Sequence, residues 1–247
     1  MPTIRGTTTL VGILGWPVSH SLSPPMQNAA FDALGLDWAY VPLPAAPEHL
    51  EEAIRGLAAA GFAGANVTIP HKTAVVGLCD EVEAAARAAS SVNTLVFSDR
   101  RVLGSSTDVA AIAQAVPPGP GAALVLGTGG SAKAAIAALE HRGYEVVVAS
   151  RRDDSWPPEA DRYGVVVNAT PVKDAPIVEL RGGQLAIDLP YNADGSPTAF
   201  ATAARAAGVD LVDGLEILVA QGALSFERWT GRPAPVDAMR ATLPPAK

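Results

Sequence analysis

The chain has 247 residues, of which 49% are hydrophobic and 17% charged, and its formal net charge is -7. Such a composition is typical of a globular protein with a substantial core and excludes an intrinsically disordered chain. No run of Lys or Arg is longer than a pair, so the acidic balance argues against nucleic acid or an anionic membrane as a partner. We therefore expect a small-molecule substrate.

The few thiol and imidazole groups argue against disulfides and metal sites. Cys79 is the single cysteine, and we expect it to be a buried, inert thiol in a reducing cytoplasm. The four histidines are scattered, so no metal site is expected. Residues 1–17 lack the pattern of a signal peptide, and the longest uncharged run, 109–132, contains "PPGPG" and is not expected to span a membrane.

Along the first half of the chain, apolar runs of strand length alternate with helical patterns. Strands are predicted at "LVGILG", "AYVPL", "GANVTI" and "VNTLVF", and helices over 23–34, over 47–60 and from Asp80 onward. Ser23 followed by Pro24 is typical of an N-cap and a first helical residue, and Asp80 is the predicted cap of its own helix. The alternation predicts an α/β fold with a largely parallel sheet.

The segment "PPGPG", residues 117–121, is the richest in structure-breaking residues and predicts a domain boundary. After it, strands are predicted at "AALVLG", "EVVVAS", "GVVVNA", "QLAIDL" and "VDLVDG", and helices up to about Arg142, over 197–207 and in the C-terminal region. The pattern predicts two α/β domains. We expect a cleft between them, because ligands commonly bind where domains meet.

The stretch "VLGTGGSAKAAIAAL" begins as a strand, turns through glycines and continues as an Ala-rich helix. It fits the pattern G-x-G-x-x-[GA] with Gly127, Gly129 and Ala132 in the three special positions, and Gly130 and Ser131 complete the loop. The first position makes the tight turn, the second admits a pyrophosphate, and the third allows close packing of helix and strand. The motif predicts a dinucleotide site in a Rossmann-like domain.

The residues after the next strand indicate which dinucleotide is bound. An acidic residue there would hold the ribose hydroxyls of NAD, but the chain has Ser150, Arg151 and Arg152. Two guanidinium groups suit bidentate recognition of a 2′-phosphate, so NADP is the predicted cofactor. The alternative is a pair of solvated arginines, partly neutralised by Asp153 and Asp154.

Four further stretches combine small polar residues with turns: "SHSLSP" (19–24), "SSVNT" (90–94), "GSSTD" (104–108) and "DGLEILVAQG" (213–222). Together with "GANVTIPHK" (64–72) and the Gly-rich loop, they closely resemble the shikimate dehydrogenase family. The likeness extends over nearly the whole chain. It implies NADP-dependent, reversible reduction of 3-dehydroshikimate to shikimate in the biosynthesis of aromatic amino acids. We expect the protein to be a monomer or a homodimer.

The resemblance assigns roles to polar residues of these motifs. Lys72 and Asp108 match the catalytic pair beside the hydroxyl or ketone that undergoes hydride transfer. The "NATP" segment is implied to lie beside the nicotinamide half of the cofactor, and Asn168 and Thr170 belong to it. The residues implied to bind the substrate carboxylate, to bind its ring hydroxyls or to line its cleft are Ser21, Ser23, Thr68, Asn93, Gln221 and Tyr191.

The chemistry agrees with these residue types. Reducing a ketone requires a proton donor at the oxygen while hydride arrives at carbon, and an ammonium group placed there also stabilises the developing alkoxide. Lys72 can do both, and Asp108 can orient the ammonium or join the proton relay. Because the two groups would titrate as a pair, the sequence leaves open which of them is the base. His71 is interpreted as structural.

The resemblance also implies a substrate-binding domain that is discontinuous in sequence. We predict this domain over 1–108 and about 222–247, with the NADP-binding domain over about 109–221. Asp213 is the predicted cap of the helix that carries Gln221 and returns the chain to the first domain. Asn66 and Asn168 are expected at strand tips, where a short amide ties down loop backbone or contacts a ligand.

Three features depart from the family pattern. Ser106 and Val109 stand where the family usually has Asn and Gly around the catalytic Asp, so a stiffer loop is expected. Lys133 stands where an Arg is common, which predicts weaker contacts to phosphate or adenine. The compact segment 153–164 indicates a trimmed region near the adenine side.

Three alternatives remain open. A dehydrogenase acting on quinate or on an amino analogue of shikimate belongs to the same class, although the presence of both Ser21 and Ser23 favours shikimate. A folate-linked methylene dehydrogenase has a similar layout and a catalytic Lys, but the S-x-S motif and Asp108 argue against it. A cofactor-sensing homologue without turnover is the third, and the intact Lys72 argues against that.

Overall fold

The computed structural model describes residues 3–154 and 156–245, and the chain divides into two compact units. The first unit extends to Thr107 and also contains Val219–Leu243, and the second contains Asp108–Leu218 and the residues from Pro244. The assignment of substrate to one unit and NADP to the other remains a prediction. No helix in the described residues is long and apolar enough to cross a membrane.

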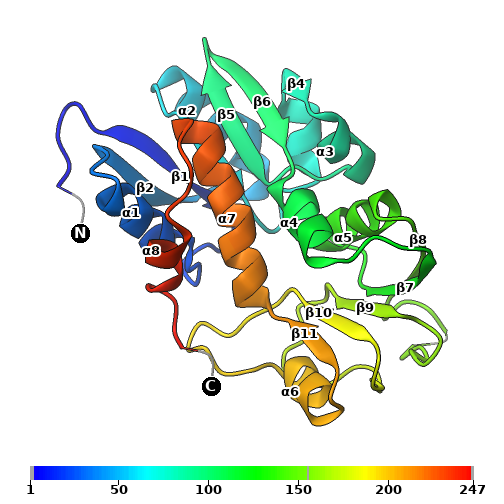
Figure 1. The fold of residues 1–247 in the computed structure, drawn as a ribbon. Coiled ribbons are helices and arrows are strands. Elements are labelled where there is room, and N and C mark those ends of the chain that lie inside the picture. Colours follow the sequence, from blue (N-terminus) through cyan, green and yellow to red (C-terminus); the bar gives the residue numbers. More distant parts are fainter. Residues whose placement is uncertain (1–2, 155, 246–247) are drawn as a thin grey trace. The chain divides into compact units, whose positions relative to one another are not determined.

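The first unit is built on a six-stranded sheet with the order β2-β1-β3-β5-β6-β4 (Figure 1). The strands are β1 (Thr9–Gly15), β2 (Trp38–Pro44), β3 (Gly64–Val67), β4 (Glu81–Val82), β5 (Thr94–Ser98) and β6 (Arg101–Ser105). The helices and 3₁₀ turns of this unit are α1 (Ser23–Ala33), η1 (Pro47–His49), α2 (Leu50–Ala59), η2 (Ala74–Leu78), α3 (Ala84–Ala89), α8 (Val236–Arg240) and most of α7 (Gly214–Thr230).

This first sheet is mixed, whereas the sequence predicts a largely parallel one. Strands β1, β2 and β3 are parallel, but β5 pairs antiparallel with both β3 and β6. A two-residue connection, Asp99 and Arg100, joins β5 to β6, and both residues have a positive φ, of 49° and 62°. Such a turn matches the twist of a tight hairpin. The residues lack the Asn-Gly or Asp-Gly signature, which is why the sequence did not indicate a hairpin here.

The second unit contains a five-stranded sheet with the order β11-β10-β9-β7-β8, and all its strand pairs are parallel. The strands are β7 (Gly121–Leu126), β8 (Tyr144–Ala149), β9 (Val165–Asn168), β10 (Leu185–Asp188) and β11 (Asp210–Val212). The helices are α5 (Gly130–His141), α6 (Ala199–Ala206) and nearly all of α4 (Thr107–Ala115). The predicted α/β class is confirmed. Counted within this unit, the strand order is 2-1-3-4-5, which places a ligand-binding switch point at the carboxyl ends of β7 and β9.

Two predicted helix caps are wrong. Ser23 is the first residue of α1 rather than its cap, and its N–H donates to the Oγ of Ser21 at 3.2 Å. Asp80 does not cap α3, because its carboxylate accepts the N–H of Val102 at 2.7 Å beside the short edge strand β4. The predicted cap at Asp213 is confirmed, since its carboxylate accepts two backbone N–H groups at the start of α7.

Helix α7 completes the core of the first unit. Phe226 stacks on Phe31 with ring centroids 5.3 Å apart, and both side chains are fully buried. The indole of Trp229 donates to the carbonyl oxygen of Leu95 at 2.9 Å. This indole lies so close to Gly64 that a Cβ there would be 2.3 Å from Nε1 of Trp229 and from the oxygen of Leu95. Gly64 is therefore required by packing.

We predict that Gly64→Ala destabilises the protein by about 3 kcal/mol, the upper range for overpacking a core. Gly56→Ala is the matched control in the same unit, because a Cβ there meets no atom within 4 Å. In a helix this control should stabilise by about 0.5 to 1 kcal/mol. Urea unfolding of both variants measures the difference. Equal effects of the two substitutions would contradict the packing account.

Candidate active site

The loop that follows β3 carries two of the predicted active-site residues, Thr68 and Lys72. The N–H of Thr68 donates to the carbonyl oxygen of Leu14 at 2.8 Å, and the carbonyl oxygen of Lys72 accepts the N–H of Val92 at 2.9 Å. Both side chains are half-buried. The backbone that carries them is bonded at both ends of the loop, so it is held in place before a ligand arrives.

His71 lies in the same loop but faces the interior. Its side chain is 2% exposed, and Nε2 lies 2.8 Å from the carbonyl oxygen of Ala45. These contacts agree with the structural role expected for this residue. His49 and His141 are exposed.

Asn93 and Gln221 are 128 residues apart in sequence, and the structure brings their side chains together. The Nδ2 group of Asn93 donates to Oε1 of Gln221 at 3.2 Å and to the hydroxyl of Thr107 at 2.9 Å. Its Oδ1 accepts the N–H of Thr107 at 2.7 Å. Thr107 was not predicted as a site residue, although it lies in the "GSSTD" motif. Thr107 fixes the orientation of the Asn93 amide.

A second layer of buried polar groups supports this pair. The Nδ2 group of Asn66 donates to the carbonyl oxygen of Asn93 at 3.1 Å and to Ser225 at 2.9 Å, and its Oδ1 accepts the hydroxyl of Tyr40 at 2.8 Å. Asn66 is 4% exposed. Asn66 was expected either to tie down backbone or to contact a ligand, and these contacts correspond to the first of the two roles. Ser225 was not predicted from the sequence, because its role comes only from hydrogen bonds to residues that are distant in sequence.

The predicted carboxylate-binding serines lie at the start of α1. Ser23 is buried and Ser21 is half-buried. Ser21 Oγ accepts the N–H of Ser23 and, as a hydroxyl, can donate its own hydrogen to a further acceptor. Gln27, one turn further along α1, donates to the carbonyl oxygen of Gly222 at 2.9 Å. This bond ties the helix that begins at Ser23 to the residue that follows Gln221.

Asp108 and its neighbours occupy the first turn of α4. Asp108 is 8% exposed, and Ser106 and Val109 are 5% and 6% exposed. Val109 is a helical residue here, so the loop that was expected to become stiffer is a regular helix start at this point. Asp108 is the first residue of the second unit, and its pairing with Lys72 remains a prediction.

The Gly-rich loop has the geometry that its motif predicts. Gly127 follows β7 with φ of 115°, and a Cβ on it would lie 2.9 Å from the carbonyl oxygen of Ala169. Gly129 is the N-cap of α5 in an extended conformation, and a Cβ there meets nothing within 4 Å. Ala132 is fully buried against the unit's interior. Gly129 therefore borders open space beside a helix N-terminus, which suits a pyrophosphate.

The tip of β8 carries the predicted determinants of cofactor choice. Ser150 donates its N–H to the carboxylate of Asp153 at 2.6 Å, and its hydroxyl accepts the N–H of Arg152 at 3.3 Å. Arg151 and Arg152 are exposed, and no carboxylate of the described residues forms an ion pair with either. Asp153 closes the turn by accepting from Ser150, so both guanidinium groups are available to an anion.

The "NATP" segment is bonded through Asn168 to the carboxylate of Asp188. Asn168 is fully buried, and its Nδ2 donates to Oδ1 of Asp188 at 2.8 Å. Its Oδ1 accepts the N–H and the hydroxyl of Thr170 at 3.0 and 2.8 Å. The side chain of Asn168 thus ties down the loop, and its predicted place beside the cofactor remains a prediction. Thr170, also predicted at the cofactor, is 8% exposed.

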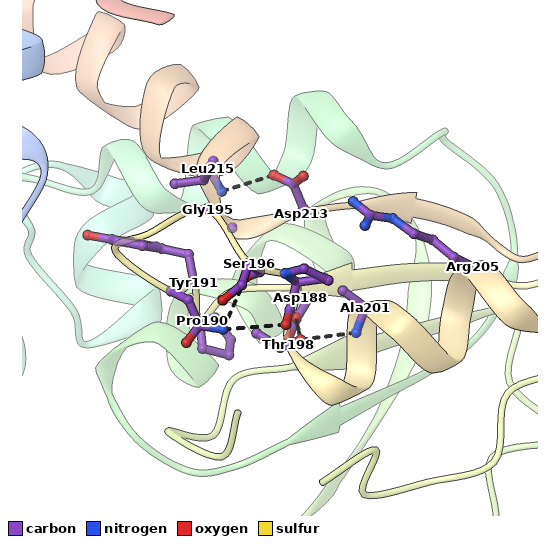
Figure 2. Close-up of a pocket in the computed structure, with 13 residues that line it drawn as sticks. Asp188, Pro190, Tyr191, Gly195, Ser196, Thr198, Ala201, Arg205, Asp213 and Leu215 are labelled. Carbon is purple, nitrogen blue, oxygen red and sulfur yellow. Dashed lines mark hydrogen bonds between the residues drawn. The ribbon is translucent and has the colours of Figure 1, made fainter. Parts of the chain in front are cut away.

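Asp188 lines a small pocket of about 30 Å³ in the second unit (Figure 2). Tyr191, predicted to line the substrate cleft, borders the same pocket, and the ammonium of Lys173 lies 6.0 Å from the centre of its ring. Burial raises the pKa of Asp188 to about 6, and the charge of Asp213 adds to the increase. Hydrogen bonds from Thr198 and Asn168 and the charge of Lys173 oppose it.

Cys79, expected to be buried, is half-buried, and its thiol donates to the carbonyl oxygen of Val75 at 3.2 Å. Burial raises the pKa of the thiol to about 11, so it stays protonated near neutral pH. This agrees with an inert thiol. Among the residues that the structure describes, no cluster of His, Cys, Asp and Glu could hold a metal ion.

We predict that Asp188 makes stability depend on pH. Its pKa is 3.8 in the unfolded chain and about 6 in the folded one. The contribution of this group to the free energy of unfolding is therefore most favourable below pH 3.8 and falls by up to about 3 kcal/mol as the pH rises through 6. Asp188→Asn removes this loss. The free energy of unfolding of this variant, relative to wild type, should therefore increase between pH 4.5 and pH 7.5.

The control for loss of a charge is Asp174→Asn, because Asp174 is exposed in the same unit. Urea titrations at the two pH values should show no comparable change for this variant. A pH-independent difference between wild type and Asp188→Asn would contradict the prediction.

Comparison with known proteins agrees with the motifs. Residues 13–95 match the model of the shikimate dehydrogenase substrate binding domain, and residues 214–243 match that of the shikimate 5'-dehydrogenase C-terminal domain. The chain is 44% identical to shikimate dehydrogenase (NADP(+)) from Anaeromyxobacter sp. (strain Fw109-5), and the alignment covers 97% of each chain.

Solved structures give the same result. Shikimate 5-dehydrogenase from Thermus thermophilus, in complex with NADP(H) and shikimate, is 31% identical with a TM-score of 0.84, over 95% of this chain and 98% of that one. A ligand-free 5-ketofructose reductase of Gluconobacter sp. strain CHM43 shares the fold, with a TM-score of 0.82 at 24% identity, over 96% and 98% of the two chains. Because curated relatives match over nearly the full length, the chain belongs to the shikimate dehydrogenase family.

Proposed function

We propose that the protein is an oxidoreductase that catalyses the NADP-dependent, reversible reduction of 3-dehydroshikimate to shikimate. The observation that carries this proposal is the 44% identity, over 97% of both chains, to a relative named shikimate dehydrogenase (NADP(+)). The Thermus thermophilus relative was solved with both ligands of this reaction. The reaction belongs to the biosynthesis of aromatic amino acids, and we expect the enzyme in the cytoplasm as a monomer or homodimer.

Lys72 and Asp108 carry the proton chemistry in this proposal. NADPH, when bound, supplies the hydride that reaches the ketone carbon. Lys72 donates a proton to the ketone oxygen, and its charge stabilises the negative charge that develops there. Asp108 orients the ammonium and takes part in moving the proton. The backbone bonds on either side of Lys72 reduce the entropy lost when it is positioned.

In this proposal the substrate is held by the polar side chains that the family resemblance assigns to it. Asn93 and Gln221 lie within hydrogen-bond distance of each other, which allows both amides to contact neighbouring hydroxyls of one small ring. Thr68 supplies a third polar contact. Ser21 and Ser23 bind the substrate carboxylate, and Tyr191 lines the site.

The cofactor is held at the carboxyl edge of the second sheet. Gly127, Gly129, Gly130, Ser131 and Ala132 form the pyrophosphate turn, and the open space beside Gly129 fits a phosphate group. Ser150, Arg151 and Arg152 bind the 2′-phosphate of NADP. The site lies at the switch point of the sheet order, where dinucleotides bind in folds of this type.

We predict that Lys72→Ala lowers kcat with shikimate and NADP by about 100-fold or more, because a positioned proton donor contributes about 10² to 10⁴. Initial rates with shikimate and with quinate, each with NADP and with NAD, measure both the loss and the substrate class. NADP titration by fluorescence is the control, since cofactor affinity should not change. If wild type binds NADP but turns over neither substrate, the assignment is wrong.

We predict that Arg151→Ala combined with Arg152→Ala weakens NADP binding by about tenfold or more, since a charge-assisted hydrogen bond contributes about 1.5 to 3 kcal/mol. Binding of NAD, which lacks the 2′-phosphate, should change little. Arg181→Ala is the matched control. Arg181 is an exposed arginine that precedes β10, so it lies at the amino ends of the strands, whereas Arg151 and Arg152 follow the carboxyl end of β8. An equal loss of NADP and NAD affinity would contradict the assignment of these arginines.

A further inference from the structure

One buried carboxylate in the second unit joins two loops, and none of the roles above uses it. Asp188, the last residue of β10, is 1% exposed. Its Oδ1 accepts the Nδ2 group of Asn168, and its Oδ2 accepts the hydroxyl of Thr198. Thr198 in turn caps α6 by accepting the N–H of Ala201 at 3.0 Å (Figure 2). Asp188 therefore connects the end of β9 to the start of α6.

The carboxylate determines which way the Asn168 amide points. An ionised carboxylate only accepts hydrogen bonds, so the NH₂ group of Asn168 must face Asp188 and the amide oxygen must face Thr170. That oxygen accepts both the N–H and the hydroxyl of Thr170, and the Thr170 hydroxyl accepts the N–H of Val172 at 3.2 Å. If the amide were reversed, its NH₂ would face the N–H of Thr170, which can only donate, and its oxygen would face the acceptor oxygen of Asp188. The turn over residues 168–172 depends on this orientation.

The same turn contacts the Gly-rich loop. Ala169 donates its N–H to the carbonyl oxygen of Leu126 at 2.9 Å. Its own carbonyl oxygen is the atom that a Cβ on Gly127 would approach to 2.9 Å, and its carbonyl carbon would be 3.1 Å away. Gly127 therefore lies directly against the backbone of Ala169. A shift of the 168–172 turn would move the first glycine of the dinucleotide motif.

A neutral amide at position 188 would avoid the cost of burying a charge, but it would no longer fix the orientation of the Asn168 amide. An amide presents a donor or an acceptor by a simple flip, so it would leave Asn168 free to reverse as well. The charged groups that face Asp188 are Lys173 and Asp213, and Arg205 lines the same pocket. The acceptor-only side chain is therefore the feature that selects one loop conformation.

We propose that Asp188 is a positioning residue for the pyrophosphate of NADP, acting through the Asn168 amide and the 168–172 turn on Gly127. The inference rests on the proposed function, because it requires the dinucleotide to bind at this loop. Asp188 itself does not touch the cofactor in this account.

The test is an exchange of the two side chains. Asp188→Asn alone should raise the Kd for NADP by about tenfold, comparable to the loss of one buried hydrogen bond. Asn168→Asp alone sets two carboxylates against each other and should weaken binding further. The double variant Asn168→Asp, Asp188→Asn again pairs one carboxylate with one amide and keeps an acceptor facing Thr170. It should restore the Kd to within about threefold of wild type.

Thr198→Val is the control for general destabilisation. It removes the other hydrogen bond to Asp188 and the cap of α6, so it should lower the unfolding temperature but leave the Kd for NADP unchanged. The inference is overturned if this control weakens NADP binding as much as Asp188→Asn does, or if the double variant binds no better than the weaker single variant. Wild type that fails to bind NADP at all would overturn the proposed function as well.

Discussion

Buried asparagine amides at strand ends hold the functional loops of both units. An amide side chain has two donors and an acceptor, and each must find a partner when water is excluded. Asn66 and Asn93 satisfy this requirement in the first unit, and Asn168 does so in the second. In each case at least one partner belongs to a segment that is distant in sequence, so the amide fixes how the two segments meet. The turn that carries Thr170 depends directly on such an amide.

Glycines complement the amides, because they let backbone or an aromatic ring approach where a Cβ would not fit. Gly64 admits the indole of Trp229, and Gly127 admits the carbonyl group of Ala169. Gly129 differs from both, since it faces open space instead of protein. That difference separates a glycine required by packing from one that is available to a ligand.

The sequence predicts the parts of this structure whose chemistry is local. The dinucleotide turn follows from Gly127 and Gly129 alone, since the strand, turn and helix are contiguous. The relation between Asn93 and Gln221 was predicted only through the family resemblance, because no periodicity joins residues so far apart. Thr107, Ser225 and Asp188 were missed for the same reason, as their roles come from tertiary partners.

The wrong predictions have a related cause. The Ser23 and Asp80 caps rest on residue type, but Ser23 bonds locally through its own N–H to the hydroxyl of Ser21, and the carboxylate of Asp80 accepts the N–H of Val102, 22 residues away. The mixed sheet arises from a hairpin turn at Asp99 and Arg100 that carries no glycine. Residue type gives a preference of only about 1 kcal/mol at such positions, and one tertiary contact can outweigh it.

The late position of α7 in the chain has a consequence for biosynthesis. The sheet of the second unit is complete by Val212, whereas the first unit requires Phe226 and Trp229 to fill its core. On the ribosome, the residues made first therefore wait for those made almost last, and Phe31 stays without its stacking partner until then. We expect the second unit to fold first during translation, and the nascent first unit to be the part that chaperones protect.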